Sequence, residues 1–321
     1  MKRLLVAIAL AALATLAAAQ PQTFPSRGVT IVSPFPPGGS TDAVARIMAQ
    51  RMAPTLGQTV VVENTGGAGG SIGAGRVARA TPDGYTIDIG QWDNHVANGV
   101  VYNLNYDLQK DFEPIGLLSI NPQLLLARKG IPADDLKSLV AWMKANPGKA
   151  TFANQQASAQ TAAVLFQQLT GTSVLLVPYR GGGPAMQDLI AGHIDLLVIQ
   201  AAAAMAQVKA GTVKAFAILS PARSPVVPGI PTVDEGGVTG LYLPGWFGLF
   251  APKGTPKDVI GKLNAAMVEA LADPAIRARF SDLGLDVASR EQQTPEGLAA
   301  FHKSEIERWW PIIRAAGIKA E

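Results

Sequence analysis

The sequence predicts an α/β protein of two lobes, each a mainly parallel sheet flanked by helices. From residue 28 onward, short apolar runs alternate with amphipathic segments, which is the pattern of βα units. The pattern stops in an irregular middle and resumes near residue 123, which indicates a second sheet. Because 48% of the 321 residues are hydrophobic, the chain can supply two cores.

The first half predicts strands at Val29–Ser33, Thr59–Glu63 and Tyr85–Gly90, with helices at Thr41–Ala53 and Ser71–Ala80. In the second half the expected strands are Gln123–Ala127, Ala150–Ala153, Ser173–Pro178, Ile194–Ile199 and Val213–Leu219, and the expected helices are Leu136–Ala145, Ala159–Leu169, Ala185–Ala191 and Ala203–Ala210. A Pro/Gly-rich stretch, 225–244, is expected to be a surface connection. It is followed by a strand at Trp246–Ala251 and by two long helices, Pro256–Ala272 and Thr294–Ala316.

The chain is expected to cross from the first lobe to the second near residue 125 and to return near residue 247. Residues 20–125 and 247–321 then form lobe I, and residues 126–246 form lobe II. Two crossover strands make a hinge, and the cleft between two lobes is a default ligand site.

The N-terminus has the pattern of a secretory signal peptide. Lys2 and Arg3 precede the apolar run Leu4–Ala14, and small residues at Ala17–Ala19 follow. The run is shorter than the roughly 20 residues that a membrane span needs, and no later apolar segment is long enough. We therefore expect cleavage near Ala19 and a periplasmic product.

Charge and composition exclude several kinds of function. Removal of Lys2 and Arg3 lowers the basic count from 27 to 25, against 24 acidic residues, and no basic run suggests nucleic-acid binding. The absence of cysteine excludes disulfides, thiolate catalysis and thiolate metal sites. Because His95, His193 and His302 lack metal-ligand spacing, we expect no metal site.

A glycine loop, Pro34–Asp42, follows the first expected strand and opens a helix that Ser40 or Thr41 can cap. Such a loop leaves free N–H groups at a helix N-terminus, on the carboxyl edge of the sheet. A second glycine loop, Asn64–Gly73, again links a strand to a helix, and its glycines allow close approach to a ligand. Together the loops could clamp one carboxylate; the alternative is two tight turns with no ligand.

Two motifs inside the second loop suggest catalysis or a cofactor, but their context fits neither. Gly69–Gly73 matches the G-x-S-x-G nucleophile elbow, yet Ser71 lies eight residues beyond the end of the strand at Glu63. Gly73–Ala78 matches a dinucleotide pattern, although the strand ends a full loop earlier. We expect no catalytic residue and no cofactor, and keep a serine hydrolase using Ser71 as an alternative.

Ordered motifs run over essentially the whole chain after the leader: Val32–Asp42, Val62–Asn64 with Gly66–Gly70, Asp83–Tyr85, Val177–Gly181, Ile230–Thr232 and Gly248–Pro252. In this order they resemble the Bug family, the TctC-like extracytoplasmic solute receptors of tripartite tricarboxylate transporters. The resemblance implies a two-lobed periplasmic binding protein of the type II-like Venus-flytrap kind, in which the two first-lobe loops hold a ligand carboxylate through backbone N–H groups and bridging water. The implied loop residues are Phe35, Ser40, Thr41, Asp42, Ala68, Gly69 and Gly70.

The resemblance also implies three contributions from the facing lobe: the loop 154–161, the turn at Tyr179 and Arg180, and Gln200 at a strand end. In many relatives the loop is rich in Gly and Ser and ends in a His. Here it has no glycine and no His, and we take Asn154, Gln155 and Ser158 as its candidate ligand residues.

Local chemistry suggests what some of these side chains do. The amide side chains of Asn154, Gln155 and Gln200 are neutral donors and acceptors, suited to a second polar group on the ligand. Gln91 and Trp92 follow a first-lobe strand into the expected cleft, where Trp92 would either stack on a ligand ring or pack under the loop. Arg180 would either pair with a second carboxylate or stay solvated.

We therefore expect a non-enzymatic, monomeric solute-binding protein. Its ligand is expected to be a small organic mono- or dicarboxylate, aromatic ones included, and its partner the membrane permease of a tripartite tricarboxylate transporter. A periplasmic sensor subunit that presents the ligand to a membrane kinase stays open as an alternative.

Overall fold

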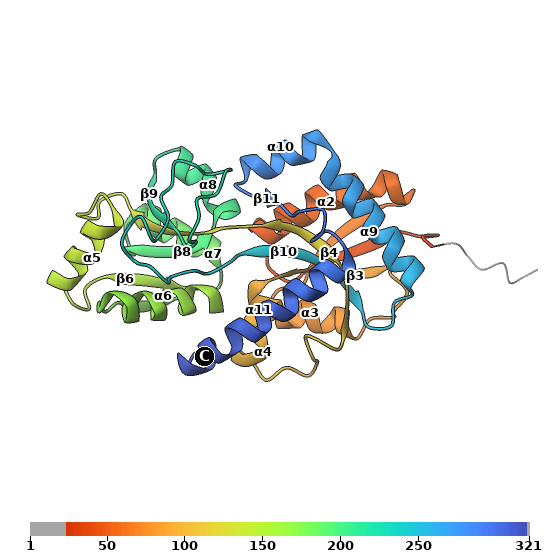
Figure 1. The fold of residues 1–321 in the computed structure, drawn as a ribbon, viewed down its shortest axis with the longest axis horizontal. Coiled ribbons are helices and arrows are strands. Elements are labelled where there is room, and N and C mark those ends of the chain that lie inside the picture. Colours follow the sequence, from red (N-terminus) through yellow and green to blue (C-terminus); the bar gives the residue numbers. More distant parts are fainter. Residues whose placement is uncertain (1–23, 320–321) are drawn as a thin grey trace, which may run out of the picture.

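The computed structural model describes residues 24–319, so the expected signal peptide lies outside the described residues. Two sheets, each flanked by helices, lie side by side along the long axis of the molecule (Figure 1). The described helices are all too short or too polar to cross a bilayer.

The first sheet has six strands in the order β11-β4-β10-β3-β1-β2. Their bounds are β1 Val29–Ser33, β2 Val60–Asn64, β3 Thr86–Gln91, β4 Phe112–Ile120, β10 Trp246–Pro252 and β11 Asp286–Val287. β1 is parallel to β2 and β3, whereas β10 is antiparallel to β3 and β4, and β11 is antiparallel to β4.

The second sheet has five strands in the order β7-β6-β8-β5-β9. Their bounds are β5 Gln123–Arg128, β6 Thr151–Asn154, β7 Leu175–Pro178, β8 Leu196–Gln200 and β9 Val213–Ile218. β6 is parallel to β7 and β8, and β5 is antiparallel to β8 and β9.

Both sheets are mixed, so the prediction of mainly parallel sheets is wrong in this detail while the two-lobed α/β architecture is confirmed. The strands that begin at the crossover points explain the difference. β5 and β10 start where the chain enters each sheet and run away from the other sheet, whereas the βα strands beside them end there. Hydrophobic periodicity predicts that a strand exists but does not give its direction.

Helices cover the sheets at nearly all the expected positions. Their bounds are α2 Ser40–Leu56, α3 Ser71–Ala78, α4 Asn98–Val101, α5 Leu136–Ala145, α6 Ala157–Thr170, α7 Gly182–Ala191, α8 Ala201–Lys209, α9 Lys257–Ala272, α10 Pro274–Asp282 and α11 Pro295–Ala315, with a 3₁₀ turn η1 Ala68–Gly70 and a π-helical turn η2 Asp93–Ala97. Six elements have no counterpart among the expected ones: β4, η1, η2, α4, α10 and β11. β4 lies in the segment whose sequence looked irregular. This strand is largely buried on both faces, so its residues do not alternate between apolar and polar.

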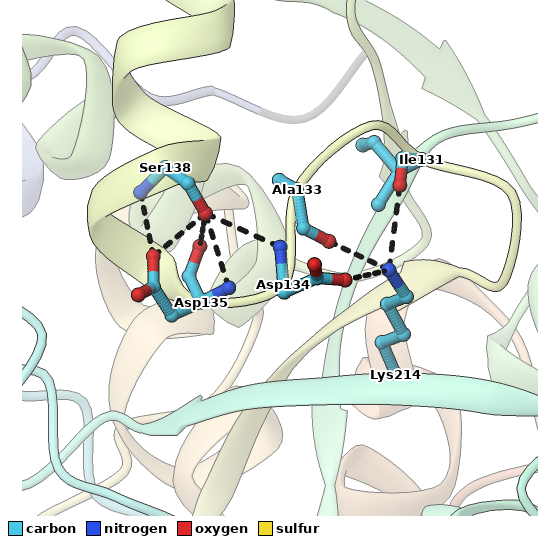
Figure 2. A network of polar contacts seen from close by, with 6 residues as sticks. All are labelled: Ile131, Ala133, Asp134, Asp135, Ser138 and Lys214. Atoms are coloured by element: carbon cyan, nitrogen blue, oxygen red, sulfur yellow. Dashed lines mark hydrogen bonds and ion pairs between the residues drawn. The ribbon is translucent and has the colours of Figure 1, made fainter.

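The connection from β5 to α5 shows how polar groups fix a helix start (Figure 2). The Ser138 amide donates to Asp135 Oδ1 (2.7 Å), and the Asp135 amide donates back to Ser138 Oγ (3.1 Å), which forms a capping box. Lys214 Nζ, from β9, donates to the Ala133 carbonyl (2.7 Å) and to Asp134 Oδ1 (2.8 Å). The cap and the lysine together tie this loop to the edge of the second sheet.

The chain passes between the sheets at two adjacent points. The Asn121 amide donates to the Gly245 carbonyl (2.7 Å), so the outgoing and returning segments are joined directly. Gln123 already pairs with Gln200 in the second sheet. The predicted lobe boundary at 125–126 therefore falls inside β5, and the sheets change at 121–122 and 245–246.

Gly245 is required at this junction, because an added Cβ would lie 2.0 Å from the Asn121 carbonyl oxygen. We expect Gly245→Ala to lower the free energy of unfolding by about 1–3 kcal/mol, the usual effect of an overpacked contact. The control is Gly261→Ala in α9, where a Cβ meets nothing within 4 Å, and which should raise stability by about 0.5–1 kcal/mol. Urea denaturation of both variants measures the difference, and equal stabilities would contradict the close contact.

Candidate functional site

The first glycine loop joins β1 to α2 and is held in shape by Asp42. The Asp42 carboxylate accepts hydrogen bonds from the Gly38 amide and from Asn64 Nδ2, both at 3.0 Å. Arg46 Nε donates to the same carboxylate at 3.0 Å. Asn64 Nδ2 also donates to the Phe35 carbonyl (3.1 Å), so the end of β2 fixes the loop that follows β1. Asp42 therefore shapes the loop.

The ionised form of Asp42 is favoured by these bonds. Burial opposes ionisation, but the hydrogen bonds from Arg46, the Gly38 amide and Asn64 outweigh it and hold the pKa of this carboxyl below its usual value. The loop therefore keeps its ties across the physiological pH range.

The first turn of α2 has backbone N–H groups that no side chain caps. Its N-cap is Gly39, which has no side chain, and the Thr41 side chain is buried. The amides at a helix start need a partner, and they carry the positive end of the helix dipole. The expected anion-binding position at the first loop is thus available in the structure.

The second loop has an unusual backbone. Gly67, Ala68, Gly69 and Gly70 have φ values of 126°, 47°, 60° and 92°. Ala68 is the one non-glycine residue with positive φ in the part of the chain that the structure describes, and this conformation costs on the order of 1–3 kcal/mol. Asn98 Nδ2 donates to the Gly69 carbonyl (2.8 Å) and holds the loop in place. Strain of this kind is typical of ligand sites.

Gly70 is the point where both loops meet a third segment. A Cβ at Gly70 would lie 2.9 Å from Phe35 Cζ and 3.0 Å from Asn94 Cβ. Asn94 Oδ1 accepts from the Gln91 amide (2.9 Å), whereas its Nδ2 is buried and has no hydrogen-bond partner among the described residues. The junction therefore offers an unused side-chain donor beside the two loops.

A chain of polar side chains joins the two lobes. Ser40 Oγ donates to Gln200 Oε1, and Gln200 Nε2 donates to Gln91 Oε1. Gln91 ends β3 in the first sheet, and Gln200 ends β8 in the second. Three of the residues expected to bind ligand are thus brought together, although their places in the sequence are far apart.

Asp93 makes a second contact between the lobes. Asp93 begins η2, directly after β3 and Trp92, and its carboxylate accepts from the Ser158 amide (2.8 Å) and from Ser158 Oγ (3.1 Å) in the first turn of α6. Burial raises the pKa of Asp93 to about 6, and the two bonds from Ser158 oppose that rise. Ser158 was expected in the site, but Asp93 was not.

Two other candidate residues of the loop after β6, Asn154 and Gln155, use part of their hydrogen-bonding capacity within the second lobe. The Asn154 carbonyl accepts from the Tyr179 amide (2.9 Å), so its main chain extends the sheet. Gln155 Nε2 donates to the Val198 carbonyl (2.7 Å), whereas Gln155 Oε1 is buried without a described partner. Gln155 therefore leaves an acceptor unused.

The Tyr179 turn lies on the outer side of this loop. Tyr179 Oη donates to Asp188 Oδ2 (2.6 Å), and burial, followed by this carboxylate, raises the pKa of Tyr179 to about 12. Arg180 is exposed. The structure does not bring Tyr179 or Arg180 into contact with the two glycine loops through any described hydrogen bond or ion pair, and their place in the site stays a prediction.

Trp92 packs into the core behind the site. Its ring is fully buried and meets Trp309 of α11 edge to face, with ring centroids 5.2 Å apart. This geometry favours the second of the two roles considered for Trp92, packing under the loop.

The C-terminal helix supports η2 from the same side. Trp310 Nε1 donates to the Val96 carbonyl (2.9 Å), and His302 Nε2 lies 2.6 Å from the His95 carbonyl oxygen. His95 Nε2 lies 2.6 Å from Asp88 Oδ2, and both side chains are fully buried. These contacts hold the turn that carries Asp93 and Asn94.

The structure speaks against a serine nucleophile at residue 71. Ser71 Oγ accepts from Asn98 Nδ2 (3.0 Å), and no described hydrogen bond joins it to a histidine. A nucleophilic serine needs a general base within hydrogen-bond reach. In the described residues there is also no cluster of three or more acidic, His or Cys side chains that could hold a metal.

Two surface hollows lie away from the glycine loops. One of about 190 Å³ lies beside the crossover point and is lined by Pro122, Ser220 and Gly245 among others. The other, of about 420 Å³, lies between Lys137 and Lys144 of α5 and the segment 234–238. At the candidate site, the hydrogen bonds from Ser40 to Gln200 and from Gln200 to Gln91 cross from the first lobe to the second.

Asp93, Asn94 and Asn98 were not among the expected site residues, although the structure places them beside the glycine loops or at the contact between the lobes. A signal was present, because a polar run follows directly on the strand expected at Tyr85–Gly90, and strand ends of an α/β sheet are where ligands bind. The π-helical turn that presents these residues has no comparable signal.

Comparison with known proteins gives consistent matches over most of the chain. A family model described as "Tripartite tricarboxylate transporter family receptor" matches residues 44–318. A protein from the TAR-I ttuE-ttuC' intergenic region of Agrobacterium vitis is 42% identical over 297 residues, which covers 92% of this chain and 86% of that protein.

Solved structures agree. The periplasmic binding protein BugD superposes with a TM-score of 0.86 at 40% identity, covering 93% of this chain and 100% of that one. MatC from Rhodopseudomonas palustris with bound malate superposes with a TM-score of 0.84 at 40% identity, covering 90% and 100%.

A buried titratable group behind η2, Glu305, makes stability depend on pH. Burial raises the pKa of Glu305 in α11 to about 7, against the opposing effects of Arg308 and of the Trp246 and Trp309 indoles. A raised pKa means that the folded state favours the neutral carboxyl, so this contribution is complete below about pH 4.5 and is lost as pH rises through 7. We expect Glu305→Gln to be more stable than the parent by about 2–3 kcal/mol at pH 8 and nearly equal at pH 4.5.

The matched control is Glu307→Gln, an exposed change on the same helix. Its stability should follow that of the parent at both pH values. Thermal melts of the three proteins at pH 4.5 and 8 make the measurement, and a Glu305→Gln advantage that does not grow with pH would contradict a buried, neutral Glu305.

Proposed function

Because the chain belongs to the tripartite tricarboxylate transporter receptor family, whose members are binding receptors and not enzymes, we propose that it captures a small organic carboxylate between its lobes for uptake by a transporter of that type. Membership of the family establishes the two-lobed solute-binding architecture. The class of ligand and the transporter partner are what we propose.

The observation that carries the proposal is a pair of uncapped helix starts at the ends of the paired strands β1 and β2, with Phe35 of the first loop lying beside Gly70 of the second. α2 follows Gly39 and α3 follows Gly70, and neither N-cap makes a side-chain hydrogen bond. Asn94 Nδ2 adds a donor without a partner among the described residues. Backbone amides, helix dipoles and an amide donor at one place favour an anion, and a carboxylate accepts from several donors at once.

The binding of malate by MatC supports this ligand class, since MatC shares the fold over nearly its whole length. The hydrogen bonds from Ser40 to Gln200 and from Gln200 to Gln91 join the two lobes, so they would stabilise a closed arrangement of the lobes. A ligand that anchors on the loops and then bonds to Gln200 would favour the closed arrangement over the open one, and only such a difference in affinity can shift the equilibrium.

We further propose that the protein is exported, is cleaved near Ala19 and acts in the periplasm as a monomer that delivers its ligand to permease subunits. Recovery of a transporter permease by cross-linking in membranes would support this partner. Recovery of a membrane kinase in its place would assign the chain to a sensor.

A ligand screen tests the carboxylate. We expect mono- and dicarboxylates to raise the melting temperature in a concentration-dependent way, because a ligand that binds the folded state stabilises it by mass action. Their uncharged amides should have no effect. A shift by uncharged compounds alone would exclude a carboxylate receptor.

A glycine substitution tests where the carboxylate binds. Gly70→Ala places a Cβ 2.9 Å from Phe35 Cζ at a position with φ of 92°, and we expect it to weaken carboxylate binding at least tenfold. The control is Gly57→Ala, which has a similar backbone strain at φ of 66°, lies at the far end of α2 and meets nothing within 4 Å. Isothermal titration of both variants decides the matter, and equal affinities would place the ligand elsewhere.

A further inference from the structure

In the facing lobe, the anion position at the start of α6 is filled by the protein itself. The N-cap of α6, Gln156, makes no side-chain hydrogen bond. The Asp93 carboxylate from the other lobe accepts the Ser158 amide (2.8 Å) and Ser158 Oγ (3.1 Å) instead. A ligand carboxylate cannot use these donors while Asp93 holds them.

Asp93 has no oppositely charged partner in the part of the chain that the structure describes. No ion pair among residues 24–319 includes Asp93, although this residue is only 1% exposed. Burial raises the pKa of Asp93 to about 6, so the group is ionised at pH 7.5 but would gain from a nearby cation. A buried carboxylate without a partner of opposite charge is an unusual feature.

Two buried acceptors without described donors occur in the segments that carry Asp93 and Ser158. Each carboxylate has about four lone-pair sites, and Ser158 occupies two. Gln155 Oε1, one residue before the N-cap of α6, and Asn98 Oδ1, at the start of α4, are buried and lack partners in the described residues. These segments therefore hold a buried negative charge and two unpaired acceptors, beside the unpaired donors Trp92 Nε1 and Asn94 Nδ2.

We propose that Asp93 is a specificity-determining residue that selects ligands with one carboxylate and, at the other end, a protonated amine. An ammonium group has a positive charge, three N–H donors and no acceptor, which complements Asp93 and the free oxygen of Gln155. A second carboxylate would instead meet a like charge in a dry site. This inference rests on the proposed anchoring of the first carboxylate at the glycine loops.

The test compares matched ligands on the unmodified protein. 4-Aminobutanoate, 5-aminopentanoate and 6-aminohexanoate are each titrated calorimetrically against succinate, glutarate and adipate, and hexanoate serves as a carboxylate with no polar far end. At pH 7.5 we expect at least one amino acid to bind at least tenfold more tightly than the dicarboxylate of its length. A preference for the dicarboxylates at every length overturns the inference.

Asp93→Asn tests the residue itself. Asparagine keeps the shape, can accept the Ser158 amide and can donate to Ser158 Oγ, but it has no charge. We expect the preference for the amino acid to fall at least tenfold while the affinity for hexanoate changes less than threefold. Asp258→Asn, an exposed change in α9, is the matched control and should leave the preference intact.

The outcomes separate the two proposals. If hexanoate and the dicarboxylates bind but Asp93→Asn leaves the preference unchanged, the role of Asp93 is wrong and the receptor stands. If no carboxylate binds, including hexanoate, the proposed function fails as well. Should Asp93→Asn not fold, Asp93→Ser and the titrations of the unmodified protein still decide the point.

Discussion

A helix whose N-cap residue is glycine has no N-cap side chain to accept hydrogen bonds from its first backbone N–H groups. The candidate site is built on two helices of this kind. α2 and α3 both begin in this way, at the ends of neighbouring strands of one sheet. The first amides of a helix need an acceptor from outside the helix, and no N-cap side chain supplies one in α2 or α3. In the proposed site the ligand is bound by the main chain, and side chains such as Asp42 and Asn98 hold that main chain in position.

In the facing lobe, a backbone N–H group at the start of a helix finds its acceptor in the first lobe. α6 also begins without a cap from its own loop, yet a carboxylate from across the cleft satisfies its first turn. Within the first lobe, α2 and α3 begin without side-chain caps and Asn94 has a donor without a described partner, whereas Asp93 has a buried carboxylate with no ion-pair partner among the described residues. A ligand with different groups at its two ends fits this asymmetry better than a symmetric one.

The site is stiffened from behind by the C-terminal helix. α11 reaches η2 through His302 and Trp310 and packs Trp309 against Trp92. Burial lowers the pKa of His302 to about 4 and raises that of Glu305 to about 7, so both groups favour their neutral forms in the folded protein. The π-helical turn that presents Asp93 and Asn94 therefore depends on a helix more than 200 residues later in the chain.

Sequence alone determined most of the elements and the two glycine loops, because apolar periodicity and glycine patterns are local properties. β1 and α5 were predicted to the residue. Strand direction in β5 and β10, the crossover at Asn121 and Gly245, and the core position of Trp92 were decided by tertiary structure, since each depends on residues distant in the chain. The same holds for Asp93, whose significance comes from Ser158, a contact across the cleft that no local pattern encodes.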